Sequence, residues 1–196
     1  MEMVIDSLER RAREFFFKAH NDTNHTYGDK PYTFHLEHTA DVARKFGYIL
    51  ETPERISKAI ACAYGHDAVS DARVSRNDIY KNLGDIDVAN ICSDLVEDMH
   101  GYVRDDRNSD AYYARIKKTV IGVFVKLCDR IANLENGIWE GGTMSIKYKQ
   151  EIFKFYEKLY HPLFDDMWEY LFSLVDNVNL PSIENSYKQL RNNYKQ

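Results

Sequence analysis

The sequence predicts an all-α protein, a single helical bundle of about eight or nine helices over residues 1–196. Apolar residues recur at spacings of three and four along most of the chain, which is the period of an amphipathic helix. Only four prolines and nine glycines occur, too few for the many turns of a β-sandwich. No internal repeat or low-complexity run marks a boundary, so one domain is expected.

Helical periodicity is clear in the first half of the chain. The helix over Thr33–Phe46 should end at Gly47, because the residue after a helix often takes the left-handed backbone that glycine tolerates. Pro53 suits the first turn of the next helix, which runs toward Gly65. Two further helices are predicted over Val4–His20 and Asp85–Met99, and the polar segment Asn21–Pro31 is predicted to be a loop.

Capping residues and glycines divide the rest of the chain. Ser75, with Asp78 three residues later, should cap a short helix that ends before Gly84. A long helix is expected over Ser109–Leu134, with a kink near Gly122 as an option. A glycine-rich loop is predicted over Glu135–Gly142, followed by helices over Ser145–Tyr160, Leu163–Val175 and Ser182–Tyr194. The helices within residues 163–194 should pack on or extend the domain.

Charge and cysteine usage narrow the class of protein. A net charge of -5 argues against a general nucleic-acid binder, which usually presents a strongly basic face. The N-terminus mixes acids and bases, so no secretory signal is expected. The longest apolar run, Val120–Val125, is far shorter than the ~20 residues of a membrane span. Three cysteines without a CxxC pair should be buried, reduced thiols of a cytoplasmic protein: Cys62, Cys92 and Cys128.

Imidazole and carboxylate groups occur near two predicted helix ends. His35 falls in the first turn of the helix over 33–46, close to a loop. His66 and Asp67 follow the next helix directly, and Asp71 comes four residues later. A histidine and an aspartate at a helix terminus can both turn toward one divalent cation. The alternative is that His66 caps the helix while Asp67 and Asp71 shape a turn.

A third segment, Lys126–Leu134 (KLCDRIANL), sets a carboxylate within an apolar helix face. Asp129 lies among leucine, isoleucine and cysteine residues, where an unpaired carboxylate is costly. Lys126, Asp129 and Asn133 share one side of this helix. The competing interpretation is a plain ion pair of Asp129 with Lys126 or Arg130.

Together, these segments provide two imidazoles and two carboxylates: His35, His66, Asp67 and Asp129. Such mixed ligation suits manganese, iron, zinc or magnesium better than a metal that prefers thiolates. A bound ion would lower the pKa of its water and polarise a phosphoryl oxygen, the two requirements of phosphate ester hydrolysis. Asp71, one turn beyond Asp67, is suited to orient or deprotonate that water.

The order of these residues resembles the H…HD…D signature of the HD-domain metal-dependent phosphohydrolases. Three segments carry the resemblance: residues 27–35 (YGDKPYTFH), 65–72 (GHDAVSDA) and 125–134 (VKLCDRIANL). It covers about residues 8–160 and is closest to the hydrolase domain of the RelA/SpoT family and to small alarmone hydrolases. The resemblance implies one ion, usually Mn²⁺, on His35, His66, Asp67 and Asp129; Fe²⁺, Zn²⁺ and Mg²⁺ stay open as alternatives.

The resemblance also implies roles around the ion. Asn133 matches an asparagine that contacts substrate, and Asp71 matches the second member of a Glu-Asp pair that handles the attacking water and the leaving group. Ser70 stands where the first member is expected. A serine can hydrogen-bond a water but cannot be its base at neutral pH. Asp71 alone would then assist catalysis, unless Asp78 or Glu97 supplies the missing carboxylate.

The substrate is expected to be a small phosphorylated nucleotide, with the 3′-pyrophosphate of (p)ppGpp as the first option. Five cations near the three segments are candidates to neutralise phosphates: Lys30, Arg73, Arg76, Lys126 and Arg130. Alarmone hydrolases tend to carry an Arg-Lys pair in the loop where this chain has Asn24-His25. A nucleoside monophosphate, a dNTP or NADPH therefore stays open as substrate. So do a nucleotide-binding regulator with weak turnover and the oligomeric state, with a homodimer as one option.

Overall fold

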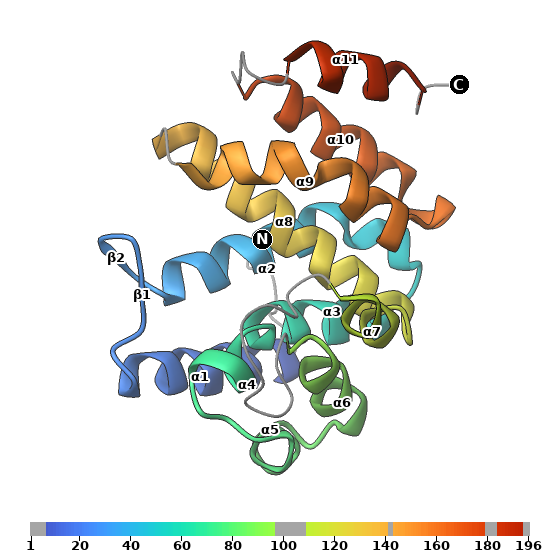
Figure 1. The fold of residues 1–196 in the computed structure, drawn as a ribbon. Helices are drawn as coiled ribbons and strands as arrows, with labels where there is room; N and C mark the ends of the chain where they lie inside the picture. The colour runs from blue at the N-terminus through green and yellow to red at the C-terminus, as the bar shows by residue number, and fades with distance from the viewer. Residues whose placement is uncertain (1–6, 97–108, 141–142, 179–183, 194–196) are drawn as a thin grey trace, which may run out of the picture. The chain divides into compact units, whose positions relative to one another are not determined.

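The computed structural model describes residues 7–96, 109–140, 143–178 and 184–193, and its long elements are all α-helices (Figure 1). The predicted all-α class is confirmed. The chain divides into two compact units, residues 1–129 (the first unit) and residues 130–196 (the second unit). The dividing point falls within helix α8 (Val120–Glu140). That residues 1–196 act as one domain stays a prediction.

Three long helices form the core of the first unit. Helices α1, α2 and α3 pack against one another, and each buries an apolar stripe that includes Phe16, Leu36 or Ala61. Burial of such side chains supplies about 1.5–3 kcal/mol for each large residue. The helices of this unit before α8 are α1 (Ser7–Asp22), α2 (Thr33–Phe46), α3 (Pro53–Gly65), α4 (Ala68–Asp71), α5 (Arg76–Leu83), α6 (Ile86–Asp94) and α7 (Asp110–Ile116).

The predicted caps of α5 are confirmed. The Ser75 hydroxyl accepts the Asp78 amide, and the Asp78 carboxylate accepts the Ser75 amide, so two helix-end donors are satisfied reciprocally. Gly84 ends the helix with the left-handed backbone (φ 68°). The predicted end of α2 at Gly47 is also confirmed, but the left-handed backbone expected there is wrong. Gly47 is right-handed (φ −56°) and begins the 3₁₀ turn η1 (Gly47–Leu50), and a Cβ there would lie 3.1 Å from Ile56.

A short antiparallel ladder joins α1 to α2. β1 (Thr26–Tyr27) pairs with β2 (Lys30–Pro31), and Figure 1 shows the connection as a narrow loop ahead of α2. Gly28 (φ 63°) allows the tight turn between them. The sequence predicted only a loop here, since two-residue strands carry no alternating pattern. The ladder is followed almost directly by the first turn of α2, where His35 lies.

The predicted start at Ser109 is confirmed as the cap of α7, and the chain breaks close to the kink left open at Gly122, but the predicted end at Leu134 is wrong. The expected helix over Ser109–Leu134 is interrupted between α7 and α8, and the Thr119 hydroxyl accepts the Gly122 amide at the new helix start (2.9 Å). The helix then continues to Glu140, through the region predicted as a loop. Gly137 does not break it, because its missing side chain lets Ser145 approach closely. Residues 141–142 lie outside the described residues.

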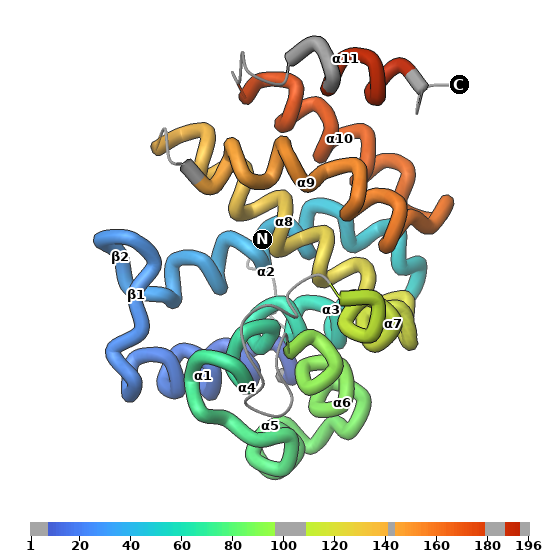
Figure 2. Tube along the Cα trace, in the orientation of Figure 1, coloured from blue at the N-terminus to red at the C-terminus, as the bar shows by residue number. Residues whose placement is uncertain are grey.

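The second unit contains the end of α8 and an aromatic helical core. The other elements are α9 (Thr143–Leu159), the 3₁₀ turn η3 (Pro162–Phe164), α10 (Asp165–Asp176) and α11 (Glu184–Asn193). α9 and α10 lie side by side (Figure 2). Aromatic side chains pack inside this unit, with Phe155 edge-on to Trp168 at 5.6 Å, whereas Tyr160 is 40% exposed.

The three cysteines are free and buried, as predicted. Burial raises the pKa of the Cys62 and Cys128 thiols, so both remain protonated. Cys62 also shares a hydrogen bond with Cys92, which links α3 to α6. These thiols are therefore packing groups rather than ligands or nucleophiles.

Candidate metal centre

Four side chains from three helices converge in the first unit. Nε2 of His35, on α2, lies 3.2 Å from Nε2 of His66 and 3.2 Å from Oδ1 of Asp129, on α8. Nε2 of His66, at the end of α3, lies 2.9 Å from Oδ2 of Asp67 and 3.5 Å from Oδ1 of Asp129. His35, His66 and Asp129 are buried at 2%, 4% and 7% exposure. His35, His66 and Asp67 thus form a group that could share one ion, and Asp129 lies against both histidines of that group.

The orientation of His66 is set by the last turn of α3. Its Nδ1 lies 2.8 Å from the carbonyl oxygen of Ala63, and a carbonyl can only accept, so Nδ1 carries the proton. Nε2, the other ring nitrogen, faces Asp67 and Asp129 and has a lone pair for an ion whenever it is not protonated. His66 therefore caps the helix through one nitrogen and faces the cluster through the other. The sequence left open whether His66 caps the helix or faces a cation, and the structure shows that the two interpretations are compatible.

This donor set fits a divalent cation. Lone pairs of two imidazoles and two carboxylates that face one another repel unless a positive charge lies among them. Nitrogen and oxygen donors in this mixture suit Mn, Fe, Zn or Mg. His35, His66 and Asp67 are close enough together to hold the ion, and Asp129 is the candidate fourth ligand because its Oδ1 lies 3.2 and 3.5 Å from the two histidines.

The titration behaviour of the cluster points the same way. Burial disfavours a charge on His66, but Asp67 and Asp129 outweigh it and raise the pKa of His66 well above its usual range. Burial lowers the pKa of His35, so that ring stays neutral. Burial opposes ionisation of Asp129, yet Lys126 and the two histidines hold the pKa of its carboxyl well below normal. Without an ion, one proton on His66 supplies the positive charge that the carboxylates require.

Lys126 belongs to the cluster through Asp129. Its ammonium nitrogen lies 2.9 Å from Oδ2 of Asp129, one helical turn away on α8. The sequence predicted Lys126 both as the partner of Asp129 and as a cation for substrate phosphates. The ion pair is present, and the side chain of Lys126 is only 14% exposed.

Tyr32 connects two of the helix ends that carry the candidate ligands. Its carbonyl accepts the amide of His35 (2.9 Å) at the start of α2, and its hydroxyl donates to Oδ2 of Asp67. Burial first, and then the charge of Asp67, raise the pKa of Tyr32, so the hydroxyl keeps its proton. On the other side, the ring of Tyr27 stacks on His35 at 4.7 Å.

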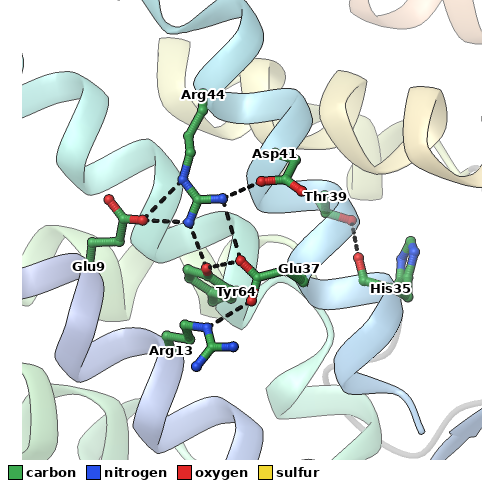
Figure 3. A network of polar contacts seen from close by, with 8 residues as sticks. All are labelled: Glu9, Arg13, His35, Glu37, Thr39, Asp41, Arg44 and Tyr64. Carbon is green, nitrogen blue, oxygen red and sulfur yellow. Dashed lines mark hydrogen bonds and ion pairs between the residues drawn. The ribbon is translucent and has the colours of Figure 1, made fainter. Parts of the chain in front are cut away.

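A polar network behind the cluster fixes the three core helices (Figure 3). Arg44 on α2 donates to Glu9 of α1 (2.5 Å) and to the hydroxyl of Tyr64 on α3 (2.7 Å). Glu37 accepts from Tyr64 (2.8 Å) and from Arg13 (2.7 Å). Glu37 and Tyr64 each lie two residues from a histidine of the cluster, so the network holds the segments that position those histidines.

Ser70 and Asp71 lie on the short helix α4, which the sequence did not predict. The Ser70 hydroxyl donates to the carbonyl of Asp67 (3.1 Å), which closes the turn after the His-Asp pair. Asp71 ends the helix, and its side chain is exposed. The Asp71 carboxylate also contributes, after burial and the charges of Asp67 and Asp129, to the raised pKa of Tyr32. Asp71 is therefore an accessible carboxylate in the electrostatic field of the cluster.

Each of the other residues predicted to contact substrate has its own set of neighbours. The ammonium of Lys30 lies over the ring of Phe34 at 4.1 Å. Arg130 belongs to the second unit, where its guanidinium is buried between the rings of Tyr148 and Phe155 at 4.1 and 4.2 Å. Asn133, also in the second unit, is half-buried one turn further along α8. Of the alternative carboxylates, Asp78 caps α5, and Glu97 lies outside the described residues.

Sequence reasoning missed Tyr32 and His20. His20 is fully buried, and its Nδ1 lies 2.9 Å from Nδ1 of His25. Both histidine rings stack on Tyr32. The sequence carries only a weak signal for Tyr32. A tyrosine three residues before His35 cannot be told from a core aromatic residue until its hydrogen bond to Asp67 is known.

Comparisons with protein-family models and with curated proteins found no match. In the described part of the chain, no helix combines the length and apolar character needed to cross a membrane.

Proposed function

We propose that this protein is a divalent-metal-dependent phosphohydrolase that acts on a phosphorylated nucleotide. The observation that carries the proposal is the convergence of His35, His66, Asp67 and Asp129 from three helices, with their ligand atoms turned toward one another. A structural core has no need for two carboxylates and two imidazole nitrogens aimed at one point, since such groups are costly to bury without a compensating charge.

The chain's own residues divide the work of the proposed reaction. The four ligands hold the ion, which when bound lowers the pKa of a water and polarises a phosphoryl oxygen. Asp71 is exposed and lies in the electrostatic field of the cluster. In the proposed reaction it orients the attacking water and accepts its proton. Lys126 neutralises part of the negative charge that Asp129 brings to the site. Mn²⁺ is the first metal to test, ahead of Fe²⁺, Zn²⁺ and Mg²⁺.

The resemblance to alarmone hydrolases supports (p)ppGpp as the first substrate, with reaction at its 3′-pyrophosphate. Alarmone hydrolases tend to carry an Arg-Lys pair in the loop where this chain has Asn24-His25. The Nδ1 of His25 is instead hydrogen-bonded to His20, so this loop lacks that pair of cations for the nucleotide. Nucleoside monophosphates, dNTPs and NADPH therefore belong in the same panel. Release of intact pyrophosphate supports the alarmone reaction, whereas orthophosphate alone supports a nucleotidase or an NADPH phosphatase. The proposal includes action in the cytoplasm, on a small molecule.

The test is Asp129→Asn, which keeps the shape of the side chain and removes its charge. We expect it to abolish Mn²⁺ binding in calorimetry and phosphate release in the nucleotide panel. Asp94→Asn is the matched control, because Asp94 also pairs with a lysine (Lys118, 2.6 Å) but lies outside the cluster. Metal binding and turnover at wild-type levels in Asp129→Asn would refute the proposal.

A second candidate function, a nucleotide-binding regulator with weak turnover, is favoured by Ser70. Its hydroxyl is engaged by the Asp67 carbonyl, at a position where a second carboxylate would assist hydrolysis. If this function holds, the wild type binds nucleotide with little turnover. Ser70→Glu should then raise turnover by about 10²–10⁴-fold, the usual contribution of a general acid or base. Ser70→Gln is the control, since it adds the same bulk without a titratable group.

A further inference from the structure

The main chain and side chain of Tyr32 bridge the starting turn of α2 and the end of α3. Its carbonyl accepts the amides of His35 and Leu36, at 2.9 and 3.2 Å, and its hydroxyl donates to Oδ2 of Asp67. A hydrogen bond to one carboxylate oxygen restricts rotation of the whole carboxylate. Tyr32 therefore limits the positions open to His35 and Asp67 together.

A pair of histidines holds the Tyr32 ring in turn. The ring of His25 stacks on Tyr32 at 3.8 Å with 14° between the planes, and the ring of His20 does so at 4.7 Å with 11°. The two Nδ1 atoms lie 2.9 Å apart, so one histidine donates to the other. The main chain follows the same path, because His20 O accepts the His25 amide and His25 O accepts the Tyr32 amide, both at 3.1 Å.

His20 is an unusual choice for a purely structural position. It is fully buried, and its Nε2 has no hydrogen-bond partner among the described atoms. Burial lowers the pKa of His20 to about 4, so the ring is neutral at neutral pH. A buried polar nitrogen without a partner lowers stability, and an apolar ring would avoid that loss. What histidine adds at position 20 is the directional bond to His25, which fixes both rings against Tyr32.

We propose that Tyr32 is a positioning residue of the candidate metal centre: its hydroxyl orients the Asp67 carboxylate, and the hydrogen-bonded pair His20–His25 orients its ring. The inference rests on the proposed function in one respect, that Asp67 is a metal ligand. Hydrogen-bond partners that orient metal ligands typically contribute about 10- to 100-fold to metal affinity.

The test is Tyr32→Phe, which keeps the ring on His20 and His25 and removes only the hydroxyl. We expect Mn²⁺, added alone, to bind about 10- to 100-fold more weakly. The electron paramagnetic resonance spectrum of the bound Mn²⁺ should change as well, because a freed Asp67 carboxylate alters the symmetry of the ligands. The unfolding midpoint of the metal-free protein is measured in parallel, since a loss of packing alone would move that midpoint without changing the spectrum.

Tyr170→Phe is the matched control. Tyr170 donates to Glu135 (2.5 Å), so the substitution removes another tyrosine–carboxylate bond, outside the candidate ligands. It should leave Mn²⁺ affinity and the spectrum as in the wild type. His25→Ala is a second variant that keeps the Tyr32 hydroxyl but removes its ring support, and a smaller loss of affinity is expected.

The outcomes separate this inference from the proposed function. Wild-type protein that binds no divalent cation would overturn both. Mn²⁺ binding by the wild type, with equal affinity and spectrum in Tyr32→Phe, would overturn the role of Tyr32 alone, as would an equal loss in Tyr170→Phe. If Tyr32→Phe fails to fold, His25→Ala decides, and unchanged Mn²⁺ affinity in that variant would overturn the inference.

Discussion

Lys126 and Asp129 form an ion pair across one turn of α8, with 2.9 Å between the ammonium nitrogen and Oδ2. The other carboxylate oxygen, Oδ1, faces His35 and His66 at 3.2 and 3.5 Å. A carboxylate has two oxygens, so Asp129 joins a local ion pair and a cluster from other helices at once. The two interpretations of Asp129 that the sequence left open are thus not exclusive.

Replacement of Lys126 by methionine should destabilise the metal-free protein. The pair is largely buried, and removal of Lys126 leaves two carboxylates, Asp67 and Asp129, with only the charge of His66, at a cost of about 3 kcal/mol. Mn²⁺ should recover part of this loss, because it supplies a positive charge on the other oxygen. Chemical denaturation with and without Mn²⁺ measures both effects. Lys118→Met, which breaks the more exposed pair with Asp94, should cost no more than about 1 kcal/mol; equal losses in the two variants would contradict this account.

The network of Figure 3 predicts a large effect for Arg44→Met. Arg44 joins three helices, and its loss leaves the buried Glu9 without its cation. We expect the free energy of unfolding to fall by about 3 kcal/mol. Arg10→Met is the control, since the pair of Arg10 with Glu14 is 62% exposed on both sides and should contribute only about 0.5 kcal/mol. Urea titration of both variants decides, and a small effect at Arg44 would show that the network is incidental.

Gly65 should not tolerate alanine. A Cβ there would lie 2.4 Å from Cζ of Phe16 and 2.8 Å from Sγ of Cys92, so the end of α3 or these two buried side chains must shift. Overpacking of this kind costs about 1–3 kcal/mol. A shift of the end of α3 also moves His66, so Mn²⁺ affinity should fall. Gly84→Ala is the comparison: it has open space but a left-handed backbone, and should lose stability without losing Mn²⁺ affinity. Wild-type Mn²⁺ affinity in Gly65→Ala would contradict the prediction.

Burial of His20 predicts a pH dependence of stability. The folded-state pKa is lowered from 6.5 to about 4, so between these values the unfolded chain binds the proton more tightly. The contribution of neutral His20 is full above pH 6.5 and is lost as pH falls toward 4, by about 3 kcal/mol in all. The amide of Asn in His20→Asn can still bond His25 but does not titrate. The variant should therefore lose this part of the dependence of unfolding free energy on pH. Denaturation curves at pH 4 to 7 measure it, and parallel slopes for the two proteins would exclude the effect.

The helices were the most predictable part of the fold, because their signals are local. The capping pair Ser75 and Asp78 and the end of the helix before Gly84 were confirmed at the positions predicted. Errors occurred where packing overrode a local preference. Gly137 has the low helix propensity of a helix breaker, but in the helix it allows the close approach of Ser145. Gly47 is right-handed and lies close to Ile56, where the local pattern predicted a left-handed residue.

The candidate site was predictable in its residue types but not in its supports. His35, His66, Asp67 and Asp129 stood out because polar groups with metal-ligating chemistry occur at helix ends or within an apolar face. Nothing local distinguished Tyr32 from other aromatic residues, or His20 from a structural histidine. Their roles depend on stacking and hydrogen bonds that join α1, the loop after it and α3.

By itself, the sequence determined the all-α class, the main helices and the four candidate ligand residues, since periodicity, caps and side-chain chemistry are properties of short segments. Only the tertiary structure decided that Nε2 of His35 and Oδ1 of Asp129 lie 3.2 Å apart, and that Tyr32 reaches Asp67. The physical reason is that these distances follow from how α1, α2, α3 and α8 bury their apolar faces. That packing depends on many residues at once and is not written in any one segment.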